Sequence, residues 1–302
     1  MSNRELVVLG TASQVPTRHR NHNGYFLRWD DIGIMVDPGE GTQRQMVMHG
    51  VRTSRIHHIC ITHFHGDHCL GLAGLIQRIS LDGVQHEVHV HYPASGEVYF
   101  QRLRRASIFV DRSRLVPRPF DRPGTLFTGD GYTLSTEMLA HTVPSWGFRL
   151  QEDDRRSVDG KAAAALGVTG PRVGQLVREG HITVGDRLIR LEEVSFARRG
   201  QSAAIVMDTR PCEGALELSR GVDLLVCEST YLQTEAAESW ERGHMTAAQA
   251  ATLARDAGAR KLVLTHFSQR YPNAQVFLDE ARPIFDNAVA AEDGAVIAVP
   301  KR

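Results

Sequence analysis

The most informative stretch of the chain is a hexapeptide that holds four side chains able to bind metal ions. It reads His-Phe-His-Gly-Asp-His over residues 63–68 and directly follows an apolar run, 59–62. A loop that leaves a buried strand can direct its first two histidines to one side and its Asp-His pair to the other. Imidazole nitrogens and carboxylate oxygens together suit Zn²⁺ or a similar divalent ion. A chance histidine cluster on a solvated turn is the alternative, but this spacing favours a metal site.

Three more candidate ligands, His141, Asp208 and His266, lie far away in the sequence. Each lies just after an apolar run, and these runs span 132–139, 203–207 and 260–265. A lone His or Asp at the end of a strand is usually a cap or a hydrogen-bonded core residue. Together with the hexapeptide, however, these residues make a set of five His and two Asp, which points to metal chemistry.

The elements that must position these side chains are short strands and helices, each indicated by its own spacing of apolar residues. Strand patterns recur at 5–9, 32–36, 57–62, 87–92, 132–139, 203–207, 222–227, 260–265 and 294–299. Helical patterns cover 41–49, 71–80, 94–107, 246–257 and 274–285. Thr246 and Gln249 form a capping box at the start of the fourth helix, and Gly258 ends it. Strands that alternate with helices predict a layered α/β fold.

Composition limits the classes of protein to consider. A chain of 302 residues with 42% hydrophobic residues can bury a sizeable core, as one large domain or two small ones. No apolar run is long enough to cross a membrane, and the N-terminus has no signal-peptide pattern. The four cysteines lack a C-x-x-C spacing, so we expect reduced thiols in a cytoplasmic protein.

Charge is balanced overall but not locally. The 35 basic and 35 acidic residues give a net charge of zero, which speaks against non-specific nucleic-acid binding. Residues 101–122, however, hold seven arginines, either on a solvated helix face or on a polyanion contact. Residues 151–195 are polar, rich in glycine and lack strong strand periodicity. We interpret 151–195 as an inserted, protruding arm, because the motifs of the site resume after it.

The order of these motifs resembles that of the metallo-β-lactamase superfamily. Two stretches discriminate further: residues 37–45 resemble the D-x-G-E-G-T-Q-R-Q signature of the ribonuclease Z family, and 265–271 resemble its T-H-x-S-x-R-Y motif. Residues 9–11 and 16–21 look like that family's opening loop. The resemblance covers nearly the whole chain. It implies a four-layer αββα sandwich over 1–302, with 151–195 as a substrate-gripping arm.

The resemblance also implies two metal ions, most simply Zn²⁺, with Mn²⁺ or Fe²⁺ as alternatives. The first would be held by His63, His65 and His141, the second by Asp67, His68 and His266, and Asp208 would bridge them. Two cations about 3.5–4 Å apart can stabilise both the attacking and the leaving oxygen of a displacement. They also lower the pKa of bound water from about 15.7 to about 7.

Three residues would move or hold protons. Asp67 can accept a proton from the attacking water and orient it. His244 is the candidate acid for the leaving ribose oxygen, and Glu228 would orient its imidazole and raise its pKa. The alternative for His244 is a residue that merely flanks a helix.

Four residues are candidate substrate contacts. Ser268 and Arg270 follow a metal ligand and could grip a phosphate, because Arg suits bidentate contact. The alternative is that Arg270 pairs with a surface carboxylate. Gly170 and Pro171 match the glycine-proline region of the family's arm.

The implied activity is a zinc-dependent endoribonuclease that removes 3′ trailers from tRNA precursors and leaves a 3′-hydroxyl on the tRNA and a 5′-phosphate on the trailer. The resemblance also implies a homodimer. One alternative is a hydrolase of the same superfamily that acts on a small phosphodiester or ester, although such a substrate needs no gripping arm. Another is a non-catalytic RNA-binding or metal-binding scaffold, against which the complete ligand set argues.

Overall fold

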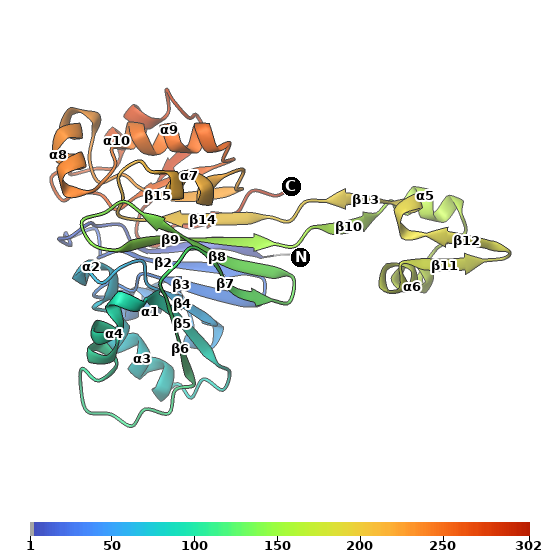
Figure 1. Ribbon diagram of the computed structural model, residues 1–302, viewed down its shortest axis with the longest axis horizontal. Coiled ribbons are helices and arrows are strands. Elements are labelled where there is room, and N and C mark those ends of the chain that lie inside the picture. Colours follow the sequence, from blue (N-terminus) through green and yellow to red (C-terminus); the bar gives the residue numbers. More distant parts are fainter. Residues whose placement is uncertain (1–2) are drawn as a thin grey trace. The chain divides into compact units, whose positions relative to one another are not determined.

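The structure is a computed structural model that describes residues 3–302, and it divides into two compact units (Figure 1). The larger unit contains residues 3–151 and 202–301, and the smaller contains 152–201. In the larger unit two β-sheets lie face to face, and each carries helices on its outer face. The layer order is therefore helix, sheet, sheet, helix, and the predicted αββα sandwich is confirmed.

The first sheet is built mainly from the N-terminal half of the chain. In spatial order its strands are β18 (Val296–Ala298), β1 (Arg4–Gly10), β2 (Gly24–Trp29), β3 (Ile32–Val36), β4 (His58–Cys60), β5 (Val88–Pro93) and β6 (Leu115–Phe120). Its outer face packs against α1 (Thr42–Met48), α3 (Leu72–Leu81) and α4 (Glu97–Arg104). Helix α3 buries Leu72, Leu75, Ile76 and Ile79, whose spacing of three and four residues places them on one side of the helix.

The second sheet comes from the C-terminal half. In spatial order its strands are β17 (Ala288–Ala290), β16 (Leu262–Thr265), β15 (Leu224–Glu228), β14 (Ser202–Val206), β9 (Ser145–Glu152), β8 (Tyr132–Leu139) and β7 (Gly124–Gly129). Helices α7 (Glu213–Ser219), α9 (Ala247–Ala257) and α10 (Gln275–Ala281) cover its outer face. The predicted capping box of α9 is confirmed: the Thr246 side chain accepts from Gln249 N, and the Gln249 side chain accepts from Thr246 N.

The central core lies between the sheets. Tyr25 and Val36 from the first sheet pack in one cluster with Trp146, Phe148 and Val226 from the second. Short elements complete this unit: the helices α2 (Gly66–Cys69) and α8 (Ala236–Arg242) and the 3₁₀ turns η1 (Thr53–Arg55), η2 (Ala94–Gly96) and η4 (Gln233–Glu235). Strand β2 escaped the sequence analysis because nearly all of its residues are buried, so apolar and polar positions do not alternate.

The smaller unit has its own core and more regular structure than the sequence suggested. Its elements are β10 (Arg155–Val158), α5 (Gly160–Ala165), α6 (Pro171–Glu179), β11 (His181–Val184), β12 (Arg187–Arg190), η3 (Leu191–Val194) and β13 (Ser195–Arg198). Strands β10 and β13 pair as one antiparallel ribbon and β11 and β12 as another. Ala163, Val168, Leu176 and Ile189 are buried among each other. The sequence shows no strong strand periodicity here, because four-residue strands are too short to give a visible period.

The four cysteines are free thiols, as predicted, and Cys60, Cys69 and Cys227 are buried. Within residues 3–302, no helix combines the length and the apolar character that a membrane crossing requires.

Candidate metal centre

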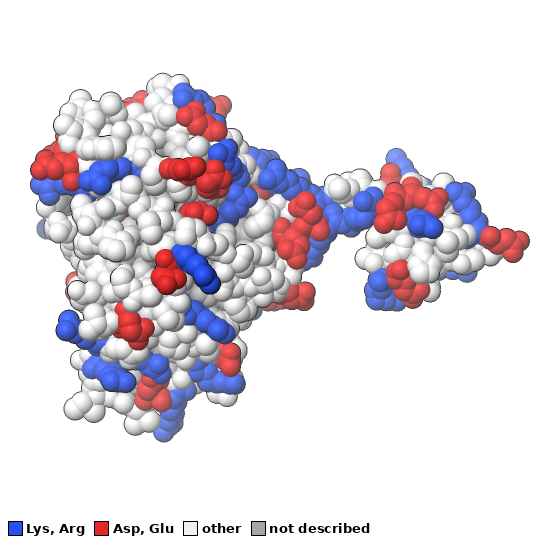
Figure 2. Space-filling model, viewed as in Figure 1, with Lys and Arg blue, Asp and Glu red and all other residues white. Residues whose placement is uncertain are grey.

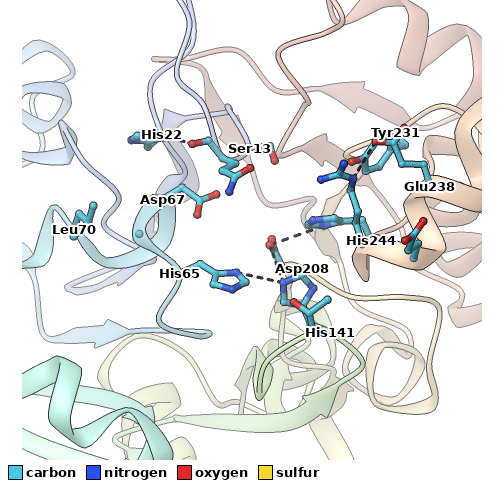
Figure 3. Close-up of a pocket in the computed structure, with 15 residues that line it drawn as sticks. Ser13, His22, His65, Asp67, Leu70, His141, Asp208, Tyr231, Glu238 and His244 are labelled. Carbon is cyan, nitrogen blue, oxygen red and sulfur yellow. Dashed lines mark hydrogen bonds and ion pairs between the residues drawn. The ribbon is translucent and has the colours of Figure 1, made fainter.

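The candidate ligands meet at one edge of the sandwich because each follows the end of a strand. The hexapeptide follows β4, His141 follows β8, Asp208 follows β14, and His266 follows β16. Four of them, His65, Asp67, His141 and Asp208, line a cleft of about 930 Å³ (Figure 3). Its lining comprises Ser13, Gln14, His22, His65, Gly66, Asp67, Leu70, His141, Thr142, Asp208, Tyr231, Glu238, Glu241, Arg242 and His244.

One group of ligand atoms comprises three histidines and one oxygen of Asp208. His65 Nδ1 lies 3.0 Å from His63 Nε2 and 3.4 Å from His141 Nε2. Asp208 Oδ2 lies 3.7 Å from His63 Nε2 and 3.6 Å from His141 Nε2. One ligand atom from each of these four residues lies within 4.8 Å of the others, close enough to coordinate one ion.

The second group comprises Asp67, His68 and His266. Asp67 Oδ2 lies 3.5 Å from the Nε2 atom of each histidine. Asp208 Oδ1 lies 3.3 Å from His68 Nε2 and 3.2 Å from His266 Nε2. Asp208 therefore turns one carboxylate oxygen toward each group, which is the position a bridging ligand requires.

Partners behind the centre hold four of the imidazoles by their Nδ1 atoms. These pairs are His63 with Thr62 Oγ1 at 3.0 Å, His68 with Asp37 Oδ2 at 2.8 Å, His141 with the Gly243 carbonyl at 2.8 Å and His266 with Thr230 Oγ1 at 2.9 Å. Both threonine hydroxyls donate to carboxylates, so each accepts a hydrogen bond from its histidine. The Nδ1 atoms thus carry the protons, and the Nε2 lone pairs point at the centre, as metal coordination requires.

Several atoms at the centre are buried without a hydrogen-bond partner among the described residues. They are His68 Nε2, His266 Nε2 and Asp208 Oδ1. A buried polar atom that forms no hydrogen bond is costly and needs an explanation. All three are lone-pair donors that face one another, so a cation satisfies them together. The residues present therefore fit a pair of divalent ions.

The electrostatics of the centre agree with cation binding. Burial holds the pKa of His63 well below its ordinary value and lowers the pKa of His65 and His141, which keeps these imidazoles neutral. Burial opposes the charge of Asp208, but His266 and His68 hold its pKa well below the usual range. Burial disfavours a charged His68 too, yet the surrounding carboxylates, Asp208 first, raise its pKa well above the ordinary value. The carboxylates thus stabilise positive charge at this centre, and bound metal ions would carry that charge.

A histidine–carboxylate pair lies beside the centre. His244 Nδ1 is 2.9 Å from Glu228 Oε1 and 4.0 Å from Asp208 Oδ2. Glu228 is fully buried and also accepts from Thr209 N and the Thr230 hydroxyl. Burial opposes a charge on His244, but Glu228 and then Asp208 outweigh it and raise the pKa of His244 to about 9.

Backbone strain gathers at the same place. Asp37, Asp208 and His266 have φ angles of 48°, 33° and 60°, which lie in the left-handed region that non-glycine residues rarely adopt. Asp37 and His266 directly follow the last residue of a strand, and Asp208 lies two residues after the end of β14. The turned backbone aims each side chain at the centre or at a ligand. Such strain persists where the surrounding structure holds it, typically at functional sites.

The predicted substrate contacts are placed less uniformly. Both Nη atoms of Arg270 lie 2.9 Å from the Glu238 carboxylate, and the guanidinium lies 4.9 Å from the centre of the Tyr231 ring. Arg270 is thus paired with a surface carboxylate, the alternative noted from the sequence, although Glu238 and Tyr231 line the cleft. Ser268 Oγ lies 3.5 Å from Arg270 N.

Gly170 and Pro171 belong to the smaller unit, where they begin helix α6. Gly170 has a φ angle of 56°, so a side chain at this position would be strained. Neither residue is part of the lining of the cleft.

Sequence reasoning missed the residues that hold the ligands in place. It gave no role to Asp37, Thr62 or Thr230, although each touches a proposed ligand. A signal existed for Asp37, which opens the 37–45 motif at the end of β3. The two threonines carry no such signal, because a hydroxyl next to a strand end is common.

Comparison with known proteins shows similarity along the whole chain. A model described as the metallo-beta-lactamase superfamily matches residues 17–145, and one described as the beta-lactamase superfamily domain matches 193–267. The chain is 53% identical to the ribonuclease Z of Streptomyces coelicolor over 304 positions, covering 100% of both. It is 42% identical to the ribonuclease Z of Chlamydia trachomatis serovar L2 over 301 positions, covering 100% of this chain and 99% of that one. The crystal structure of the short form of human tRNase Z superposes with a TM-score of 0.73 and 25% identity, covering 98% of this chain and 99% of that one.

Proposed function

This chain belongs to the ribonuclease Z family of the metallo-β-lactamase superfamily, and on that premise we propose that it is a metal-dependent endoribonuclease that removes 3′ trailers from tRNA precursors. The observation that carries the proposal is Asp208, whose two oxygens face two separate groups of ligands. A centre for a pair of ions suits phosphodiester hydrolysis, in which both the attacking and the leaving oxygen need stabilisation.

In this proposal His63, His65 and His141 hold one ion, Asp67, His68 and His266 hold the other, and Asp208 bridges them. We propose Zn²⁺ for both, since His-rich sets with carboxylates suit it, and Mn²⁺ or Fe²⁺ are the alternatives. When bound, two such ions make a water molecule acidic and stabilise negative charge on the phosphate.

The chain's own residues then orient the reactants and move protons. Asp67 is the member of the second group that lines the cleft, where its carboxylate can accept a proton from the attacking water and orient it. His244 donates a proton to the leaving ribose 3′-oxygen, so that the tRNA keeps a 3′-hydroxyl and the trailer a 5′-phosphate. Its hydrogen bond to the buried Glu228 fixes the ring and favours the protonated form that a general acid needs.

We propose substrate contacts in each of the two units. Ser268 and Arg270 lie just beyond His266, and Arg270 can reach a phosphate by exchanging Glu238 for it, since both are bidentate acceptors. Gly170 and Pro171 offer backbone and shape contacts from the smaller unit, which we propose is the arm that grips the precursor.

We also propose that the enzyme works as a cytoplasmic homodimer. The cytoplasmic location is supported by the four free thiols, since reduced cysteines are typical of that compartment. The homodimer follows from the resemblance to the family alone.

The decisive experiment incubates the purified protein with a trailer-bearing tRNA precursor and separates the products by size. We expect a product of mature tRNA length and a free trailer, both lost after chelation and restored by Zn²⁺. A protein that contains two equivalents of metal, yet leaves the precursor intact and hydrolyses a small phosphodiester, would instead support the alternative hydrolase.

A further inference from the structure

We propose that Arg210 is a positioning residue, which holds the end of helix α8 and the turn that follows it in place beside the metal centre. This turn carries two groups of the site. The Gly243 carbonyl accepts from His141 Nδ1 at 2.8 Å, and the imidazole of His244 lies beside Asp208. Arg210 is not part of the lining of the cleft, so it would act through these two groups. The role assigned through His244 rests on the proposed function, whereas the role through His141 rests on the geometry of the centre.

Helix α8 ends at a glycine in the left-handed conformation. Gly243 has a φ angle of 79°, its N–H donates to the Trp240 carbonyl at 3.2 Å, and the N–H of His244 donates to the Ser239 carbonyl at 2.8 Å. This pair of bonds is a common way to end a helix, because it satisfies carbonyls that have no partner inside the helix. The same backbone turn therefore ends α8 and places His244.

The side chain of Arg210 completes this cap from a different part of the chain. Its Nε atom donates to the Trp240 carbonyl at 2.6 Å, and its Nη2 atom donates to the Glu241 carbonyl at 3.3 Å. The guanidinium also lies 5.3 Å from the centre of the Trp240 ring. A positive charge is favourable here, because the C-terminal end of a helix carries a partial negative charge.

The backbone of Arg210 connects this cap to the metal centre. Arg210 lies two residues after Asp208, and its N–H donates to the Ala140 carbonyl at 2.9 Å, next to His141. It thus joins the segments that follow β14 and β8 to the end of α8. These three segments carry Asp208, His141 and His244, which Figure 3 shows together at the cleft. A shift of α8 would therefore displace His141 and His244 relative to Asp208.

The turn packs directly against a proposed metal ligand. A β-carbon at Gly243 would lie only 2.7 Å from His141 Nδ1. Because the two groups are in such close contact, a displacement of the turn must also displace the imidazole.

The ion pairs of α8 cannot replace this cap. Glu238 pairs with Arg242 at 3.0 Å and with Arg270 at 2.9 Å, and Figure 2 shows acidic and basic side chains together over this helix. Exposed ion pairs contribute little to stability. They also hold side chains on the surface of the helix, whereas Arg210 holds its last backbone carbonyls.

The test compares Arg210→Gln with the matched control Arg149→Gln. Arg149 also donates to carbonyls at the end of a helix, those of Leu218 and Arg220 after α7, and it lies outside the lining of the cleft. Both variants should lower the unfolding temperature. Only Arg210→Gln should weaken metal affinity in competition with a chelator, by about 10-fold, the lower end of the loss expected when the partner that orients a metal-bound histidine is disturbed.

Activity measured with Zn²⁺ in excess tests the placement of His244. Arg210→Gln should lower kcat for the precursor roughly 100-fold at unchanged KM, because a misplacement of about 1 Å can cost that factor. Hydrolysis of bis(p-nitrophenyl) phosphate should fall much less, since p-nitrophenolate leaves without needing a proton. Arg210→Lys keeps the charge and a donor, so it should recover part of the kcat.

A second pair of variants perturbs the same turn without changing Arg210. Gly243→Ala is compared with Gly258→Ala, because Gly258 ends α9 with a φ angle of 67° and has open space around its β-carbon position. Both substitutions add similar backbone strain. Only Gly243→Ala would press on His141, so it alone should reproduce the loss of metal affinity.

Wild-type metal affinity in Arg210→Gln would overturn the inference, and so would equal losses of metal affinity in Arg210→Gln and Arg149→Gln. A kcat that falls by the same factor for the precursor and the small phosphodiester would also overturn it. If the wild-type protein leaves the precursor intact, the proposed function fails, whereas the chelator competition still tests the placement of His141.

Discussion

Asp37→Asn tests whether residues behind the metal centre decide how tightly it binds metal. Asp37 is fully buried and accepts three hydrogen bonds: from Thr62 N at 2.8 Å, from the Thr62 hydroxyl at 2.7 Å and from His68 Nδ1 at 2.8 Å. Asparagine keeps the size of the side chain and tolerates the left-handed φ of 48°. It replaces one acceptor oxygen with an NH₂ group, which cannot accept from the Thr62 hydroxyl or from His68.

The magnitude follows from those contacts. A buried donor left without an acceptor costs about 1–3 kcal/mol, so the free energy of unfolding should fall by that order. Loss of the partner that orients a metal-bound histidine typically weakens metal affinity about 10- to 100-fold, which is about 1.4–2.7 kcal/mol. We expect the effect on the ion held by Asp67, His68 and His266, because His68 is the ligand that Asp37 contacts.

The assay is competition with a chelator of known affinity, followed by elemental analysis of the protein. The matched control is Asp223→Asn, which alters a buried carboxylate that accepts from Ser202 N and Arg260, away from the cleft. We expect both variants to lose stability but only Asp37→Asn to lose metal affinity. If both variants bind metal with wild-type affinity, or if both lose metal affinity equally, the contact of Asp37 with His68 does not control metal binding.

Three further outcomes are expected. Asp67→Ala should abolish precursor cleavage while largely sparing precursor binding in a gel-shift assay; equal loss of both would assign Asp67 a structural role. Glu228→Gln should lower the pKa of His244 from about 9 to its ordinary value of about 6.5 or below. His244 is protonated below its pKa in the folded protein, so the variant should lose the proton at a lower pH than the wild type does. The protonated fraction at pH 8 then falls about 30-fold, and so should kcat relative to wild type; a pH–rate profile with an unmoved alkaline limb would contradict this role. Val158 and Ser195 are paired across the ribbon, so a short turn can replace residues 159–194. This replacement should reduce precursor processing far more than hydrolysis of a small phosphodiester reporter. Equal losses of both activities would refute the arm assignment.

Local sequence was enough to predict the type of chemistry. The hexapeptide at 63–68 places four ligands within six residues, and the apolar residues before it were enough to predict the strand that it follows. The layered α/β class was also predictable from the alternating strand and helix patterns, whereas the four-layer arrangement was implied only by the resemblance of the motifs to the family. The capping box at Thr246 depends only on residues three apart in the chain, so it could also be predicted from the sequence.

Tertiary structure alone decided how the distant residues meet. That Asp208 turns one oxygen to each ligand group depends on where β14 ends relative to β4 and β16, which no local pattern contains. The pairing of Arg270 with Glu238 and the contact of Arg210 with the Trp240 carbonyl likewise join residues 32 and 30 positions apart. Periodicity reports which face of an element is buried, whereas contacts between elements depend on strand order and register, which are set by the packing of the whole chain.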